Sequence, residues 1–127
     1  MRVVGLTMRF GSKLIHRDLD LTVQRGEILA IVGGSGSGKT TLLREMAMLQ
    51  EPTAGAVRIL GRDTARMDEA QALHLRRRIG VLFQNGALFG GLNVLENIAV
   101  PLREHTRLSR PLIEEIACVK LALVGLE

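Results

Sequence analysis

One run of small residues that ends in a lysine and two threonines carries the clearest chemistry in the sequence. The run matches the spacing G-x-x-x-x-G-K-(S/T) and consists of Gly33, Gly34, Ser35, Gly36, Ser37, Gly38, Lys39, Thr40 and Thr41. Its glycines let the backbone fold tightly, so that successive N–H groups and a following helix N-terminus point at phosphate oxygens. Lys39 would neutralise the outer phosphates of a nucleotide, Thr40 would be a ligand to Mg²⁺, and Thr41 would add a hydroxyl near the innermost phosphate. The run therefore predicts a phosphate-binding loop.

The segments on either side have the pattern that such a loop requires. Residues 28–32 form a continuous apolar run, typical of a strand that is covered on both faces of a parallel sheet. From Lys39 onward apolar residues recur at helical spacing, and Pro52 ends this helical region. A flexible Gly-Ser turn is the alternative, but average residue usage gives such a match by chance in roughly one chain of this length in a few hundred.

Apolar patterning predicts further strands on both sides of this unit. Residues 19–23 alternate apolar and polar side chains, and residues 1–8 are a looser strand that would pair with them in a small antiparallel region. Residues 56–60 predict a short strand before a turn, and residues 79–83 predict another buried strand. Gln84 follows the last of these, where ligands usually bind in α/β proteins, although a glutamine there is by itself more often a turn residue.

Three more helices are predicted from residues that favour helix starts. Asp68 with Gln71 resembles a capping box and predicts a helix to about Arg78. Asn93 with Glu96 resembles another capping box and predicts a second helix, which Pro101 should kink or end. Ser109 and Pro111 predict the start of a third helix that runs towards Gly125. The sequence thus alternates strands and helices, as an α/β fold does.

Composition restricts the class of protein. The chain has 127 residues, 46% of them hydrophobic and 24% charged, which indicates one globular domain. Its single cysteine excludes an intramolecular disulfide and a cysteine-based zinc site, and indicates a reducing compartment. The longest uncharged stretch, residues 79–95, is too polar for a membrane-spanning helix, and we identify no export signal. A net charge of +4 does not distinguish nucleic acid, anionic lipid or nucleotide as a partner.

Taken in order, these residues resemble the N-terminal half of an ATP-binding cassette (ABC) transporter ATPase. The resemblance covers essentially the whole chain and rests on Phe10-Gly11, Gly26-Glu27, the phosphate loop, Pro52-Thr53-Ala54-Gly55, Gly61-Arg62-Asp63 and Phe83-Gln84. It implies an α/β P-loop NTPase fold with an N-terminal antiparallel β region, which with the phosphate loop spans about residues 1–84, and the start of a helical subdomain over about residues 85–127.

The resemblance also implies roles for single residues. It makes Gln84 the glutamine that contacts Mg²⁺ and the attacking water and that senses a transmembrane partner. It places Phe10 where the family has an aromatic residue stacked on adenine, and a planar Phe ring suffices for stacking. The alternative for Phe10 is an ordinary apolar residue of an edge strand.

Residues 82–89, 93–97 and 101–106 are similar to a narrower group, the Mla-type phospholipid-transport ATPases. This similarity implies ATP binding and hydrolysis that power lipid transport through a membrane permease, together with a protein carrying an Mce domain. It further implies a second ATPase subunit in a head-to-tail dimer and a cytoplasmic location, peripheral on the inner face of the membrane. Leu88, Phe89 and Leu92 would lie at the permease interface or in the core.

Several parts of the family pattern do not occur in these residues. After Glu127 the family would supply the Leu-Ser-Gly-Gly signature, a strand ending in Asp and the catalytic Glu, and a switch His. We therefore expect little or no ATP hydrolysis by this chain alone, and we expect residues 28–32 to lack neighbouring strands. A second hypothesis is a nucleotide-binding fragment without hydrolysis or transport. A third, a P-loop kinase or nucleic-acid-binding protein, is disfavoured by Phe10 and Gln84 at transporter spacing, the absence of an aromatic cluster and the small net charge.

Overall fold

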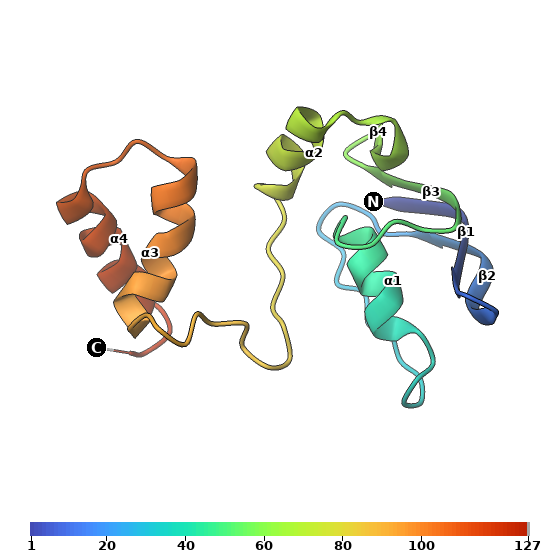
Figure 1. The fold of residues 1–127 in the computed structure, drawn as a ribbon, viewed down its shortest axis with the longest axis horizontal. Coiled ribbons are helices and arrows are strands. Elements are labelled where there is room, and N and C mark those ends of the chain that lie inside the picture. Colours follow the sequence, from blue (N-terminus) through green and yellow to red (C-terminus); the bar gives the residue numbers. More distant parts are fainter. Residues whose placement is uncertain (127) are drawn as a thin grey trace. The chain divides into compact units, whose positions relative to one another are not determined.

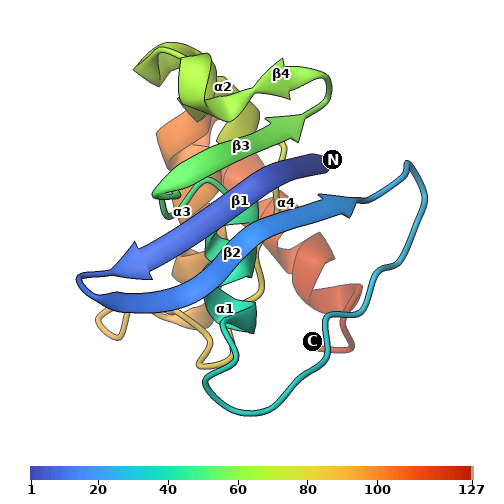
Figure 2. The same cartoon turned by 90° about the vertical axis from the view of Figure 1, so that its right-hand side faces the viewer.

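The first unit of the molecule, residues 1–81, is built on an antiparallel sheet. The computed structural model describes residues 1–126 and divides them into this unit and a second one that starts at Leu82. The sheet has the strand order β2-β1-β3-β4, with β1 in the middle of the long strands (Figure 2). The strands are β1 (Arg2–Phe10), β2 (Lys13–Thr22), β3 (Ala54–Ile59) and β4 (Arg62–Asp63). This confirms the predicted antiparallel β region, with longer strands than the patterning indicated.

The hydrophobic core of this unit lies between the sheet and helix α1 (Lys39–Met46), which Figure 2 shows behind β1 and β2. Val3 and Leu6 of β1 and Val57 of β3 are at most 2% exposed. They pack in one cluster with Leu42 and Met46 of α1. The helix that follows the phosphate loop is therefore held in place by its apolar face.

Glycine at position 55 is required by the close approach of β3 to β1. Gly55 has φ +89°, and a Cβ there would overlap the carbonyl oxygen of Gly5 and lie 2.7 Å from the Cα of Leu6. Any larger residue would push the two strands apart, so Gly55 allows the sheet to close over the core.

Two predicted strands do not form. Residues 28–32 and 79–83 have no strand assignment, and Ile28 is 99% and Leu82 94% exposed. A strand needs a neighbour to satisfy its backbone N–H and C=O groups, and within residues 1–126 the only sheet is the antiparallel one described above. The strand prediction is therefore wrong for these segments, whereas the expectation that residues 28–32 lack neighbours is confirmed.

A short helical segment completes the first unit. After β4 come the 3₁₀ turn η1 (Thr64–Arg66) and helix α2 (Glu69–Arg76). Oδ1 of Asp68 accepts a hydrogen bond of 2.8 Å from the backbone N–H of Gln71, which confirms Asp68 as the N-cap. The helix ends two residues before the predicted Arg78.

The second unit, which begins at Leu82, contains helices α3 (Val94–His105) and α4 (Arg110–Ala122) (Figure 1). Asn93 and Glu96 form the predicted capping box, because each side chain accepts a hydrogen bond from the other's backbone N–H. Pro101 lies inside α3, so of the two predicted effects, a kink or an end of the helix, the end does not occur. The predicted start of α4 at Ser109 and Pro111 is confirmed. No helix within residues 1–126 is long and apolar enough to cross a membrane.

Candidate functional site

The glycine run forms a loop that leads directly into helix α1. Gly38 is the N-cap of α1 and has φ +93°, a left-handed conformation that glycine adopts without strain. A Cβ at this position would lie 2.7 Å from Cγ2 of Ile15 on β2. Glycine is therefore needed here because of both the backbone conformation and the close approach of Ile15 on β2.

Lys39 closes the loop on itself. Its Nζ donates to the carbonyl oxygens of Gly33 at 2.8 Å and Gly34 at 2.7 Å, and lies 3.3 Å from Oγ of Ser37. All three ammonium hydrogens therefore point at oxygen atoms of the loop. A phosphate group that enters the loop would offer charged oxygens in place of these neutral ones, which strengthens each hydrogen bond.

The electrostatics of the loop favour an anion. The first turn of α1 contains no acidic residue, so the partial positive charge of the helix N-terminus is not neutralised within that turn. A cavity of about 150 Å³ opens there and is lined by Ile15 and by residues 36–41. This volume is well below the roughly 300 Å³ of pockets that enclose a whole drug-sized ligand. The cavity therefore suits phosphate groups, and the rest of a nucleotide would lie outside it.

A second cavity, of about 290 Å³, adjoins the start of α1. It is lined by Leu29, Ile31, Lys39, Thr40 and Leu43. Leu29 and Ile31 belong to the segment that was predicted as a buried strand, and each is more than a third exposed. The segment thus lies next to Lys39 and Thr40, although it lacks strand partners.

The loop could complete the coordination of a magnesium ion whose other ligands are mainly phosphate oxygens. Thr40 offers one neutral hydroxyl at the start of α1, and it lines both cavities. Within residues 1–126 no group of three or more His, Cys, Asp or Glu side chains could form a metal site on its own. Mg²⁺ commonly keeps several waters and binds through one or two protein groups plus substrate phosphates, so a single hydroxyl is a suitable ligand.

The other two predicted site residues lie outside the loop. Phe10 is at the end of β1, beside the tight turn to β2, and its ring is half exposed. Gln84 is an exposed residue of the second unit, in the turn that follows Phe83. Within the first unit the structure thus brings together residues 33–41, with Phe10 on the same sheet as Ile15.

Three residues near the loop were missed by the sequence analysis. Ile15 lines the cavity, and behind it Nε2 of His16 lies 2.9 Å from Oε2 of Glu45 on α1. Burial lowers the pKa of His16 and raises the pKa of Glu45 to about 7, because both charged forms lose contact with water. No local sequence signal identifies these residues, since their proximity follows from the packing of β2 on α1.

Comparison with known proteins identifies the family. The family described as "ABC transporter" matches residues 16–124 of this chain. The phospholipid transport ATP-binding protein MlaF of Haemophilus influenzae is 41% identical over 99% of this chain and 48% of its own length. The Escherichia coli K12 protein of the same name is 44% identical over 46% of its length. The Mycobacterium tuberculosis H37Rv protein named "Probable ribonucleotide transport ATP-binding protein mkl" is 43% identical over 35% of its length.

Solved structures give the same result for the fold. The dimeric structure of MJ0796, titled a bacterial ABC transporter cassette, superimposes with a TM-score of 0.89 at 31% identity. It is matched over 99% of this chain and 57% of its own. The chain therefore spans about half the length of the MlaF relatives and of MJ0796 and about a third of the length of the mycobacterial relative. These matches confirm the predicted α/β fold of the ABC ATPase type, and the chain belongs to the ABC transporter family, with Mla-type phospholipid-transport ATPases among its relatives.

Proposed function

We propose that this chain binds ATP with Mg²⁺ through residues 33–41 and is part of the ATPase that powers a lipid transporter. The observation that carries the proposal is the ring of oxygen atoms around Nζ of Lys39, at the N-terminus of a helix with no acidic residue in its first turn. A cation inside a tight loop, next to the positive end of a helix, attracts phosphate oxygens. A related cassette of known structure has been described bound to ADP and Pi, which supports a nucleotide as the ligand.

Each site residue has a proposed role. Lys39 and the loop N–H groups bind the outer phosphates, and Thr40 is the ligand to Mg²⁺, which supplies charge neutralisation between them. Thr41 adds a hydroxyl near the α-phosphate. Phe10 stacks on adenine, for which its half-exposed ring is available. Gln84 contacts Mg²⁺ and the attacking water and links the nucleotide state to the membrane partner.

We propose phospholipid as the cargo and a membrane permease as the partner. The proposal follows the MlaF relatives, whereas the name of the mycobacterial relatives indicates ribonucleotide as the competing cargo. A second ATPase subunit in head-to-tail arrangement and a lipid-binding protein with an Mce domain complete the proposed assembly, in which this chain is cytoplasmic and peripheral on the inner face of the cell membrane. Residues 1–84 would supply the nucleotide site and residues 85–127 the start of the helical subdomain.

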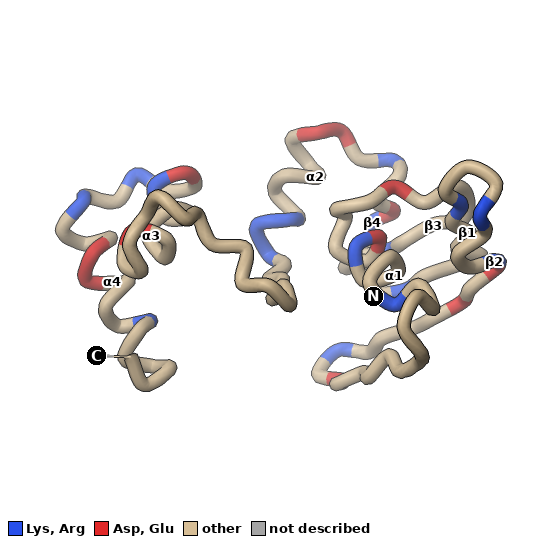
Figure 3. Tube along the Cα trace, turned by 60° about the horizontal axis from the view of Figure 1, so that its bottom comes forward, with Lys and Arg blue, Asp and Glu red and all other residues tan. Residues whose placement is uncertain are grey.

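We expect residues 1–127 to bind ATP but to hydrolyse little or none of it. Residues 1–127 contain neither the Leu-Ser-Gly-Gly signature nor the strand that ends in Asp and Glu. A general base typically contributes about 10² to 10⁴ in rate, so residues 1–127 alone should show little or no turnover. Nucleic acid is not a proposed partner, because Lys and Arg are scattered along the trace and interspersed with Asp and Glu (Figure 3).

The experiment measures ATP binding and turnover for the full-length gene product and for residues 1–127. We expect the full-length product to bind and hydrolyse ATP, and its Lys39→Ala variant to lose both. Reconstitution with its permease in vesicles that contain a fluorescent phospholipid then tests the cargo. ATP-dependent transfer of the lipid supports the proposal, and transfer of a labelled ribonucleotide alone would replace it. Phosphotransfer to an added small molecule would indicate a kinase instead.

A further inference from the structure

A partly buried histidine and a buried glutamate meet next to the start of α1. Nε2 of His16 on β2 lies 2.9 Å from Oε2 of Glu45 on α1, and the two side chains are 10% and 0% exposed. The contact has the length of a hydrogen bond without good alignment, and within residues 1–126 no other group hydrogen bonds to Nε2 or to either carboxyl oxygen. Because a buried polar group without a partner is costly, each of the two side chains depends on the other.

The same pair lies next to the glycine from which α1 starts. A Cβ on Gly38 would be 3.8 Å from Nδ1 of His16 and 2.7 Å from Cγ2 of Ile15. Glu45 follows Gly38 by about two helical turns and so lies on the same face of α1. Its side chain also leans back towards the helix N-terminus, as helical side chains do. His16 therefore lies beside the residue that begins α1 and contacts Glu45 near the end of the helix.

We propose that His16 and Glu45 are a positioning pair for nucleotide binding, which holds α1 against β2 and makes the affinity for a nucleoside triphosphate depend on whether the Glu45 carboxyl carries its proton. Neither residue touches the phosphates, and both act through the orientation and electrostatic environment of α1. The inference rests on the proposed binding of ATP by residues 33–41.

The direction of the pH effect follows from burial. Burial raises the pKa of Glu45 to about 7 and lowers the pKa of His16, so burial favours the neutral form of each group, and Glu45 keeps its proton mostly below about pH 7. Above about pH 7 the carboxyl of Glu45 loses its proton and leaves a negative charge in the interior under the loop. This charge repels phosphate and draws Glu45 towards water, so the affinity for ATP should fall as pH rises.

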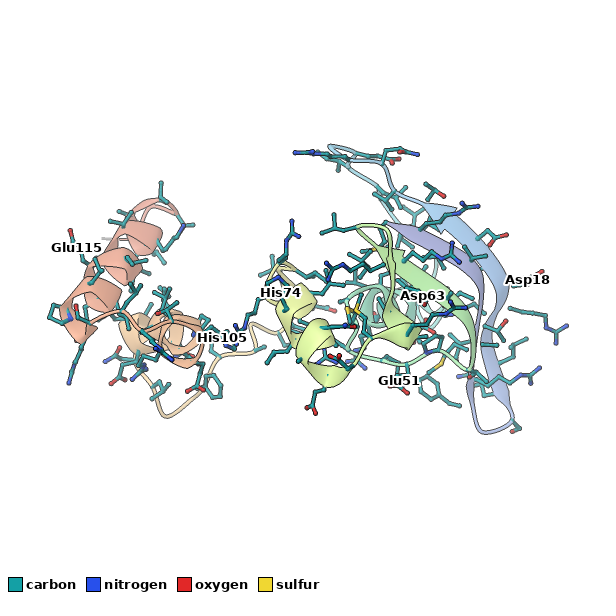
Figure 4. All side chains as sticks on the ribbon, turned by 90° about the horizontal axis from the view of Figure 1, so that it is seen from above. Asp18, Glu51, Asp63, His74, His105 and Glu115 are labelled. Atoms are coloured by element: carbon teal, nitrogen blue, oxygen red, sulfur yellow. The ribbon has the colours of Figure 1, made fainter. Side chains whose placement is uncertain are left out.

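Other charged residues lie near the pair, and they are the same in the wild type and in each variant. Glu45 also lines a cavity of about 520 Å³, whose other charged residues are Glu51, Asp68, Glu69 and Arg76, from the loop after α1 and from α2 (Glu51 is labelled in Figure 4). On the sheet, β1 places the uncharged Met8 opposite His16. On α1 itself, Lys39 points at the loop carbonyls, and Arg44 is exposed. A comparison of Glu45 with glutamine therefore isolates the proton of the pair.

The test is the affinity for a fluorescent ATP analogue with Mg²⁺, measured on the full-length gene product from about pH 6 to about pH 8.5. Glu45→Gln imitates the protonated carboxyl, so the ratio of the wild-type Kd to the variant Kd should rise at least about threefold over this range. Met46→Leu on the same helix is the matched control for packing and should keep the wild-type pH profile. His16→Gln removes the neutral ring beside the protonated carboxyl and offers an amide N–H to the carboxylate instead, so it should move the midpoint of the profile downward by at least about half a pH unit.

The outcomes separate this inference from the proposed function. Parallel pH profiles for wild type and Glu45→Gln would overturn the positioning pair, as would a change of slope in Met46→Leu equal to that in Glu45→Gln. If Glu45→Gln does not fold, the His16→Gln variant decides: an unchanged midpoint in its pH profile of ATP affinity overturns the positioning pair. Equal binding by wild type and Lys39→Ala would instead refute nucleotide binding by the loop, whatever the pH profiles show.

Discussion

Glu45→Gln should make the free energy of unfolding less dependent on pH between about 4.5 and about 7. The carboxyl of Glu45 is buried, and its pKa in the folded state is about 7 against an ordinary value of 4.5. The folded state therefore binds this proton more tightly than the unfolded state does, and the free energy of unfolding falls as pH rises between these two values. The free energy of unfolding falls by about 1.36 kcal/mol per pH unit, which adds up to about 3 kcal/mol. Glu45→Gln has no titrating carboxyl at this position, so its free energy of unfolding does not fall in this way.

The assay is urea unfolding followed by far-UV circular dichroism, because the chain contains no Trp or Tyr. Between about pH 4.5 and pH 8 the stability of Glu45→Gln relative to wild type should increase by up to about 3 kcal/mol. Glu51→Gln, which changes an exposed glutamate that lines the same cavity, should stay within about 0.5 kcal/mol. A wild type that gains stability with rising pH relative to Glu45→Gln would refute the reasoning, because Glu45 would then be stabilised as a carboxylate paired with a charged His16.

Three further substitutions, at two glycines and one helix cap, give predictions. Gly38→Ala should cost about 2 kcal/mol and weaken ATP binding, since φ is +93° and the new Cβ meets Ile15, and unchanged unfolding and Kd would contradict this. Gly55→Ala should cost at least about 3 kcal/mol in urea unfolding, because its Cβ would overlap the backbone of Gly5, and a loss below about 1 kcal/mol would show that the strands separate easily. Asn93→Ala should increase hydrogen exchange of the α3 amides by an amount equal to about 1 kcal/mol, and unaltered exchange would argue against the capping box.

Local patterns in the sequence predicted the features that depend on neighbouring residues. The phosphate loop was predicted from the spacing of its glycines and Lys39, and the structure places these residues in a loop at the start of α1. The caps at Asp68 and Asn93 were predicted because a capping residue contacts the backbone only three residues away. The antiparallel region was predicted from the alternation of apolar and polar residues in residues 19–23.

Features that depend on distant residues could not be predicted in the same way. An apolar run such as residues 28–32 indicates a strand, but the strand forms only where another strand supplies hydrogen-bond partners. Pro101 was expected to kink or end α3, and the helix continues past it to His105. The contact between His16 and Glu45 joins residues that lie far apart in the sequence, and neither residue type indicates the other.

The central claim is that residues 33–41 bind the phosphates of ATP. The most direct test titrates a fluorescent ATP analogue with Mg²⁺ into the full-length gene product, its Lys39→Ala variant and a Lys120→Ala control that removes an exposed lysine of α4. Saturable binding that Lys39→Ala weakens at least about tenfold and Lys120→Ala leaves unchanged is the predicted result. Equal affinity in the wild type and Lys39→Ala would contradict the claim.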